Sequence, residues 1–232
     1  MDDPRLRAVL FDVDFTLAKP GPDLGPEGYR RLGRRFALDL DADRYPEART
    51  AAIANLKRHP ELEHDEEIWI AFTEEIVRRM GGDGDRAHAC AVEMTRLWEH
   101  SENFELYEDV LPVLAELRRH GLKLGLVSNT GRDLDGFVLH HALDVDAAVS
   151  SRAHGKTKPD PSIFRAALDL LAVEASSTAM VGDSIDDDVE GARALGMRAF
   201  LLDREGRHPD LPEALRGLHE LPGVLGLTSP AP

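Results

Sequence analysis

Five short apolar runs, each followed by polar sequence, constrain the fold of this chain most strongly. They read RAVLF, LKLGLV, DAAVS, TAMVG and MRAFLL, at residues 7–11, 122–127, 146–150, 178–182 and 197–202. Runs of this length are typical of strands that are covered on both faces of a sheet. When helices connect such strands, the strands pair in parallel. The pattern therefore predicts an α/β fold built on a parallel sheet.

The connecting segments support this interpretation. An amphipathic segment precedes each of the last four runs, and we expect helices near Asp109–His120, Leu134–Leu143, Pro161–Leu171 and Asp187–Leu195. Gly121 and Gly196 follow two of these segments, at the position where glycine commonly ends a helix. We also expect Asp186 to cap the last of these helices.

The stretch between the first run and residue 106 has a different pattern, in which we expect helices and no strand. Trp69, Phe72, Ile76 and Met80 recur at the spacing of one helix face. The predicted helices lie near Pro26–Leu38, Pro46–Arg58, Asp65–Met80 and Asp85–His100. The sequence therefore predicts an all-helical domain at 20–103, inserted into a core made of 1–19 and 104–226, with a disordered tail at 227–232.

Charge and composition exclude several classes of partner. The net charge is −15, which argues against a nucleic-acid backbone or an anionic membrane as partner. Cys90 is the single cysteine, so no internal disulfide can form. No apolar run approaches the ~20 residues of a membrane-spanning helix, and we expect a cytoplasmic protein.

Polar side chains follow the apolar runs at the points where the strands would end. Asp12 and Asp14 follow the first run, Ser128 and Asn129 the second, and Asp183 the fourth. The segment HGKTKPDP, between the third and fourth runs, adds two lysines, Lys156 and Lys158. The carboxyl ends of parallel strands share one edge of a sheet, where ligands bind. We therefore expect these groups to converge there.

This combination of groups suits phosphate chemistry. Carboxylates on neighbouring strands, ~4.8 Å apart, repel one another unless a cation lies among them. Mg²⁺ takes oxygen ligands of this kind together with substrate phosphate. A hydroxyl, an amide and a lysine would bind the remaining phosphate oxygens, and one ionised aspartate would be free to attack phosphorus. The candidates for phosphate binding are Ser128, Asn129 and one of the two lysines, Lys156 or Lys158.

Four segments together carry a resemblance to a known family. DVDFTL, LVSNT, KPDPSIF and VGDSIDDDVEGARALGM resemble, in order, the four motifs of the haloacid dehalogenase-like hydrolase superfamily. The helical insertion lies where that family has its cap of the first type. The resemblance implies a Rossmann-like parallel-sheet core with an inserted all-helical cap domain.

The resemblance also implies catalytic roles. Asp12 would be the nucleophile that becomes an aspartyl phosphate, and Asp14 would be the general acid–base. Ser128 would bind the phosphoryl group. The segment KPDPSIF selects Lys158 over Lys156, and Lys158 would offset the charge of the phosphoryl group and orient Asp12. Position 15 is a departure from the family, because Phe15 stands where glycine is commonest.

The implied metal site takes Mg²⁺ as its cofactor. Its ligands would be Asp12, Asp183 and Asp14, the last through its backbone carbonyl. A second acid of the fourth motif would hold metal-bound water or the lysine. The resemblance implies Asp188 as this acid, but the three consecutive aspartates of the motif leave Asp187 as the alternative.

The function expected from these residues is a Mg²⁺-dependent phosphatase that acts on a small phosphorylated metabolite. A 2-haloacid dehalogenase would use the same nucleophile, but carboxylate attack on carbon needs neither Mg²⁺ nor a leaving-group acid such as Asp14. A phosphomutase on the same fold remains an alternative. A phospho-accepting signalling module without turnover is a fourth possibility, although such modules lack a long helical insertion.

Overall fold

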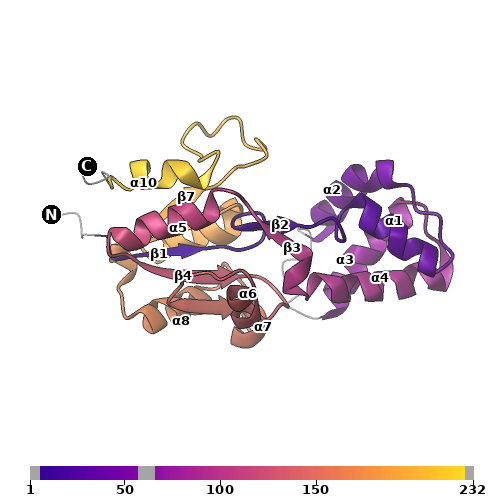
Figure 1. The fold of residues 1–232 in the computed structure, drawn as a ribbon, viewed down its shortest axis with the longest axis horizontal. Coiled ribbons are helices and arrows are strands. Elements are labelled where there is room, and N and C mark those ends of the chain that lie inside the picture. Colours follow the sequence, from indigo (N-terminus) through magenta and orange to yellow (C-terminus); the bar gives the residue numbers. More distant parts are fainter. Residues whose placement is uncertain (1–5, 57–65, 228–232) are drawn as a thin grey trace. The chain divides into compact units, whose positions relative to one another are not determined.

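The structure, a computed structural model, describes residues 6–56 and 66–227. The chain divides into two compact units. The core unit comprises Met1–Lys19 and Leu106–Pro232, and the helical unit comprises Pro20–Glu105 (Figure 1). Apart from Leu227, the tail predicted to be disordered lies outside the described residues.

The core unit contains a parallel sheet of five strands, in the order β5-β4-β1-β6-β7. The strands span Ala8–Phe11 (β1), Lys123–Ser128 (β4), Ala147–Ser150 (β5), Thr178–Gly182 (β6) and Arg198–Leu201 (β7). Each lies within one of the five apolar runs or extends one residue beyond it. The predicted α/β fold with a parallel sheet is therefore confirmed.

The strand order places a reversal beside β1. From β1 the chain builds outward through β4 to β5, then returns to the other side of β1 and continues through β6 to β7. The central strand therefore has neighbours from distant parts of the chain, with Phe11 opposite Leu126 of β4 and Val181 of β6. Ligands of open α/β sheets bind at such reversals, outside the carboxyl ends of the strands.

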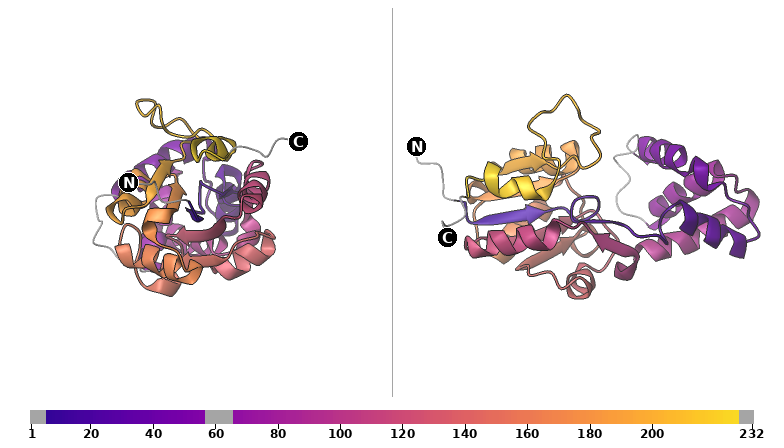
Figure 2. Two further views of the ribbon diagram at one scale, coloured as in Figure 1. Left: turned by 90° about the vertical axis from the view of Figure 1, so that its left-hand side faces the viewer. Right: turned by 45° about the horizontal axis from the view of Figure 1, so that its top comes forward.

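Helices of the core unit flank this sheet (Figure 1). They span Val110–Arg119 (α5), Leu134–His140 (α6), Ser151–His154 (α7), Pro161–Leu171 (α8), Gly191–Ala194 (α9) and Leu221–Val224 (α10). A long loop leads from β7 toward α10, and it stands out in the turned views of Figure 2. Successive side chains of a strand point to opposite faces of the sheet. Ala8 and Leu10 of β1 therefore both lie on the face that α8 covers.

Helix α8 shows how the sequence sets these elements. Asp160 caps it by accepting a hydrogen bond from the backbone N–H of Ser162 at 2.8 Å, and Pro161 occupies its first position. Its buried face packs on the sheet through Ile163, Phe164, Ala167, Leu168 and Leu171. The spacing of these apolar residues is that of one helix face.

The last predicted helix differs in form from the expectation. The segment after β6 begins with a π-helical turn at Ile185–Glu190 and continues into α9. Ser184 caps it by accepting a hydrogen bond from the N–H of Asp187, so the expectation that Asp186 is the cap is wrong. Such wide turns often occur at functional sites.

The helical unit contains the four predicted helices. They span Pro26–Arg35 (α1), Tyr45–Leu56 (α2), Glu66–Arg79 (α3) and Gly84–Trp98 (α4). Ile76 of α3 and Met80, directly after this helix, are buried in the interior of this unit with Cys90 and Met94 of α4. Within the described ranges, no helix combines the length and the apolar character required to cross a bilayer.

The expectation of no strand before residue 106 is wrong. Ala18–Pro20 (β2) and Phe104–Leu106 (β3) pair in a two-stranded sheet. Strands of three residues are too short to show an alternating pattern, and their partner lies far along the chain. The backbones beside them approach closely, since a Cβ on Gly21 would lie 2.8 Å from the carbonyl oxygen of Asn103.

Candidate active site

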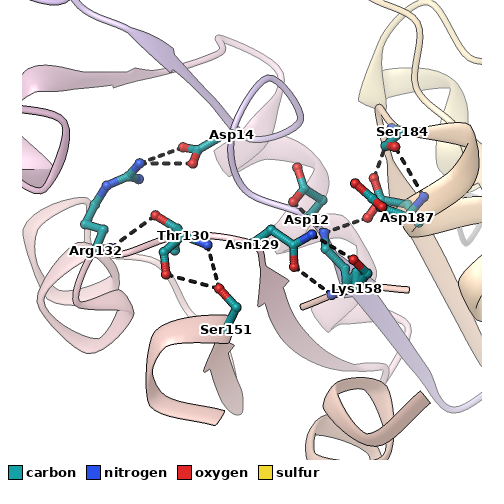
Figure 3. Close-up of polar contacts among 10 residues, drawn as sticks. Asp12, Asp14, Asn129, Thr130, Arg132, Ser151, Lys158, Ser184 and Asp187 are labelled. Carbon is teal, nitrogen blue, oxygen red and sulfur yellow. Dashed lines mark hydrogen bonds and ion pairs between the residues drawn. The ribbon is translucent and has the colours of Figure 1, made fainter. Parts of the chain in front are cut away.

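The predicted site residues of the core unit gather at the carboxyl edge of the sheet. Asp12 follows β1 directly, is buried, and donates its backbone N–H to the carbonyl of Val181 at 2.9 Å. Lys158 lies beside it, and its Nζ donates to Oδ1 of Asp12 at 2.7 Å (Figure 3). The same Nζ donates to Oδ1 of Asp188 at 2.6 Å. All three side chains are almost fully buried. One ammonium group therefore bridges two carboxylates.

Asn129 fixes the position of Lys158. The backbone N–H of Lys158 donates to Oδ1 of Asn129 at 2.7 Å, and Nδ2 of Asn129 donates to the carbonyl of Lys158 at 3.0 Å (Figure 3). Asn129 was expected to bind phosphate, but here both ends of its amide hold the lysine backbone. Lys156, the other lysine of this loop, is exposed.

Three carboxylates form a candidate metal centre. Asp12, Asp183 and Asp188 each offer an oxygen, and these atoms lie within 4.8 Å of one another. Asp188 reaches this position because β6 ends in a glycine, Gly182, on which a Cβ would lie 2.1 Å from Oδ2 of Asp188. The same oxygen accepts a hydrogen bond from the N–H of Ser184 at 3.0 Å. Asp188 is thus the acid of the fourth motif that contacts the lysine.

The electrostatics of this cluster favour a cation. Burial and the neighbouring charge of Asp12 raise the pKa of Asp183 to about 6. Burial also raises the pKa of Asp188, although Lys158 opposes the shift. Burial alone would lower the pKa of Lys158, but the two aspartates raise it, so the ammonium stays charged. Three carboxylates around one ammonium leave excess negative charge, and closely spaced carboxylate oxygens suit Mg²⁺.

Asp183 has a further partner that its motif does not indicate. Nη2 of Arg207 donates to Oδ2 of Asp183 at 2.7 Å. Arg207 belongs to the loop after β7, which Asp203 organises by accepting from the N–H groups of Arg207 and His208 at 2.7 and 2.9 Å. The Arg207 side chain is 43% exposed, so this contact lies at the solvent side of the cluster.

The carboxylate of Asp14 lies apart from the three clustered carboxylates and pairs with Arg132. Nη2 of Arg132 contacts Oδ1 of Asp14 at 2.8 Å and Oδ2 at 3.1 Å (Figure 3). Burial raises the pKa of Asp14 above its ordinary value, and the charge of Arg132 opposes this shift. The structure therefore places the two aspartates of the first motif in two electrostatic environments.

Phe15, the departure from the family pattern, lies in a strained turn after Asp14. Phe15 has a φ of 65°, which lies in the left-handed region that glycine adopts without strain. Its N–H donates to the carbonyl of Ala18 at 2.6 Å and closes a tight turn. A glycine would satisfy this backbone geometry more easily than phenylalanine.

The structure places the other predicted residue, Ser128, at the buried carboxyl end of β4, beside β1. Sequence reasoning missed two arginines, Arg132 and Arg207, that pair with the predicted aspartates. Arg132 follows the motif LVSNT by two residues. A basic side chain so close to a motif of the acidic site is a sequence signal that could have predicted a contact with one of the aspartates. Arg207 lies in a loop rich in charged residues, where nothing in the sequence distinguishes it.

Comparisons with known proteins match both the sequence and the fold. A model of the haloacid dehalogenase-like hydrolase family matches residues 6–196. The phosphoserine phosphatase of Thermus thermophilus is 34% identical over 239 residues, which cover 90% of this chain and 93% of that protein.

Two solved structures extend these matches. A HAD phosphatase from Thermococcus onnurineus is 28% identical with a TM-score of 0.63. A 2-haloacid dehalogenase from Pseudomonas syringae pv. Tomato is 25% identical with a TM-score of 0.61. Each comparison covers 95% of this chain and 98% of the other.

Proposed function

The chain belongs to the haloacid dehalogenase-like hydrolase family, and from this premise we propose that it is a Mg²⁺-dependent phosphatase acting on a small phosphorylated metabolite. The observation that carries the proposal is the cluster of Asp12, Asp183 and Asp188 around Lys158. Such a cluster suits a divalent cation and a phosphoryl group together. The similarity to a phosphoserine phosphatase supports the same reaction class.

Asp12 is the nucleophile in this proposal. Lys158 holds its Oδ1, so Oδ2 remains to attack phosphorus. The attack forms an acyl phosphate and breaks the bond between phosphorus and the ester oxygen. Lys158 keeps Asp12 oriented and offsets the negative charge of the incoming phosphoryl group. Ser128, buried at the end of the neighbouring strand, binds a phosphoryl oxygen.

The metal ligands in this proposal are Asp12, Asp183 and the backbone carbonyl of Asp14. When bound, Mg²⁺ neutralises the negative charge that the phosphoryl group and the carboxylates bring together. Asp188 has a different role in this proposal. Its Oδ1 accepts a hydrogen bond from Nζ of Lys158, which keeps the lysine against Asp12.

Asp14 performs the proton transfers. It donates a proton to the leaving alkoxide and then takes one from the water that cleaves the aspartyl phosphate. Burial raises the pKa of this carboxyl, which is the direction that a general acid requires.

The helical unit serves as the cap domain of the family in this proposal, with residues 20–103 selecting the substrate. Loops and lids of this kind exclude water and complete an active site in many enzymes. Replacing residues 20–103 with a short linker should remove discrimination among metabolites and retain some hydrolysis of small aryl phosphates. Unchanged discrimination among metabolites would contradict the role of residues 20–103 in selecting the substrate.

Dehalogenation of a 2-haloacid is the second candidate, because a solved 2-haloacid dehalogenase is 25% identical over most of the chain. In that reaction Asp12 would attack carbon and halide would leave without a proton or a cation. The cluster of three carboxylates argues against it, since such a site would hold unneeded negative charge.

A direct test compares both reactions in one preparation. Wild-type protein and Asp12→Asn are assayed with p-nitrophenyl phosphate, a panel of phosphorylated metabolites and 2-chloropropionate, with Mg²⁺ or with a chelator. The proposal predicts that the wild type with Mg²⁺ turns over phosphate esters. The wild type with chelator, and Asp12→Asn in either condition, should show no phosphate release. Halide release from 2-chloropropionate in the presence of chelator, without phosphate release, would establish the dehalogenase instead.

A further inference from the structure

We propose that Arg132 is a positioning residue for Asp14, which fixes the direction in which that carboxylate faces the leaving-group oxygen. This inference rests on the proposed function, because Asp14 is the proton donor of that reaction. Nothing in the motifs assigns a role to Arg132. The contact joins two loops at the carboxyl edge of the sheet, one after β1 and one after β4.

The contact leaves the carboxylate able to react. One nitrogen of Arg132, Nη2, lies 2.8 and 3.1 Å from the two oxygens of Asp14, so it approaches along the axis of the carboxylate. Each oxygen keeps a lone pair that the arginine nitrogen does not occupy. The Asp14 side chain is 22% exposed and the Arg132 side chain 1%. The carboxylate is therefore held from its buried side and remains open on the other.

Arg132 is itself held rigidly enough to act as an anchor. Its guanidinium lies over the ring of Phe137 in α6, with its central carbon 5.2 Å from the ring centroid. Its backbone N–H donates to Oγ1 of Thr130 at 3.2 Å. Thr130 is tied to Ser151, which accepts from its N–H at 3.0 Å and donates to its carbonyl at 3.3 Å (Figure 3). The β4–α6 loop thus connects the guanidinium to the N-terminus of α7.

Asp14 needs such an anchor because its own backbone lies outside the five-stranded ladder. Strand β1 ends at Phe11, and the chain after Asp14 turns sharply through the left-handed Phe15. Proton transfer requires an approach of about 2.6–3.2 Å between donor and acceptor. A misplacement of about 1 Å can lower a rate by about 10²-fold. Backbone hydrogen bonds hold the turn itself, and the ion pair adds the restraint on the Asp14 side chain.

The test measures kcat and KM for Arg132→Lys and Arg132→Met on alkyl phosphates and on p-nitrophenyl phosphate. Alkoxides need a proton to leave, whereas nitrophenolate leaves readily without one. We expect kcat on alkyl phosphates to fall about 10²-fold in Arg132→Met with little change in KM. Formation of nitrophenol in the first turnover should fall much less. Lysine should restore part of the loss, since it keeps the charge.

Arg152→Ala is the matched control. Arg152 is exposed and belongs to the neighbouring segment, where its Nη1 donates to the carbonyl of Gly131 at 2.7 Å. It touches the same loop without contacting Asp14. Its removal should leave the ratio of alkyl to aryl rates unchanged, which separates positioning of Asp14 from general disturbance of the loop.

A double variant excludes a purely structural effect. In the Asp14→Asn background, Arg132→Lys should cause no further change in the ratio of alkyl to aryl first-turnover rates. Equal losses on both substrate classes, or an equal change in both backgrounds, would overturn the positioning role. An inactive wild type would contradict the proposed function instead, so the two failures are distinguishable. Thermal unfolding of each variant identifies any that has lost its fold.

Discussion

Nζ of Lys158 lies 2.7 Å from Oδ1 of Asp12, although 146 residues separate the two in the chain. The parallel sheet makes this contact possible, because it brings the ends of β1 and of its neighbours to one edge. The ammonium also contacts Asp188, so it compensates two buried carboxylates at once. Burying a charge is costly unless it is paired.

Replacing Lys158 with methionine should therefore reduce both stability and activity. The change leaves two buried carboxylates without their ammonium, and breaking a buried pair costs about 3–5 kcal/mol. We expect a lower free energy of unfolding in the metal-free protein and loss of phosphate release. Lys156→Met, in the same loop but exposed, should retain both properties. Equal behaviour of the two variants would contradict the role of the bridge.

Gly182→Ala should disturb the position of Asp188. The added Cβ would lie 2.1 Å from the carboxylate, so the aspartate or the strand must move. Overpacking of this kind costs about 1–3 kcal/mol, and the displaced carboxylate would release Lys158. Gly223→Ala is the control, because nothing lies within 4 Å of the position that its added Cβ would take. Chemical denaturation and kcat together check the result; a silent Gly182→Ala would show that Asp188 does not need this space.

The hydrogen-bonded carboxylate of Asp109 should make the folded protein less stable as the solution becomes acidic. Burial alone would raise its pKa, but hydrogen bonds from Arg204 at 2.8 and 3.0 Å and from the N–H of Leu218 at 2.7 Å lower it. Its contribution is thus complete above the unfolded pKa of about 3.9 and is lost as pH falls through the lower folded value.

Urea unfolding from neutral pH to about pH 3 measures this contribution. The difference in unfolding free energy between wild type and Asp109→Asn should be constant near neutrality and shrink at the acid end. Asp210→Asn, at an exposed aspartate, should follow the wild type throughout. A constant difference down to the lowest pH would contradict the assignment.

Asp183→Asn should weaken Mg²⁺ binding. The variant removes one of three clustered carboxylate charges and leaves a side chain of similar shape. Titration calorimetry with Mg²⁺ alone checks this without relying on catalysis, and Asp186→Asn, at a neighbouring acidic residue, serves as the control. Equal affinities of the two variants for Mg²⁺ would contradict the assignment of Asp183 as a metal ligand.

The sequence allowed the sheet and its site edge to be predicted because both depend on local patterns. The apolar run at 178–182 coincides with β6, and Asp12 follows β1 as expected. The segments β2 and β3 escaped prediction because their pairing depends on contacts between distant residues. Local sequence carries little information on such pairs.

The same distinction applies within the site. Lys158 could be chosen over Lys156 from the motif, and Asp188 contacts it in the structure. The pairing of Arg132 with Asp14 spans 118 residues and depends on how two loops approach each other. No periodicity encodes that approach. Asn129 was recognised as a site residue, but its hydrogen bonds to the backbone of Lys158 became visible only in three dimensions.

The central claim, that Asp12 carries the phosphoryl group, is tested most directly by rapid quenching of Asp14→Asn with p-nitrophenyl phosphate and Mg²⁺. This variant lacks the base for the second step, so it should release a burst of nitrophenol and accumulate phosphoprotein. Borohydride reduction of the acyl phosphate followed by mass spectrometry should locate homoserine at position 12. Wild-type phosphate release without a burst or modification at position 12 in the variant would contradict the account.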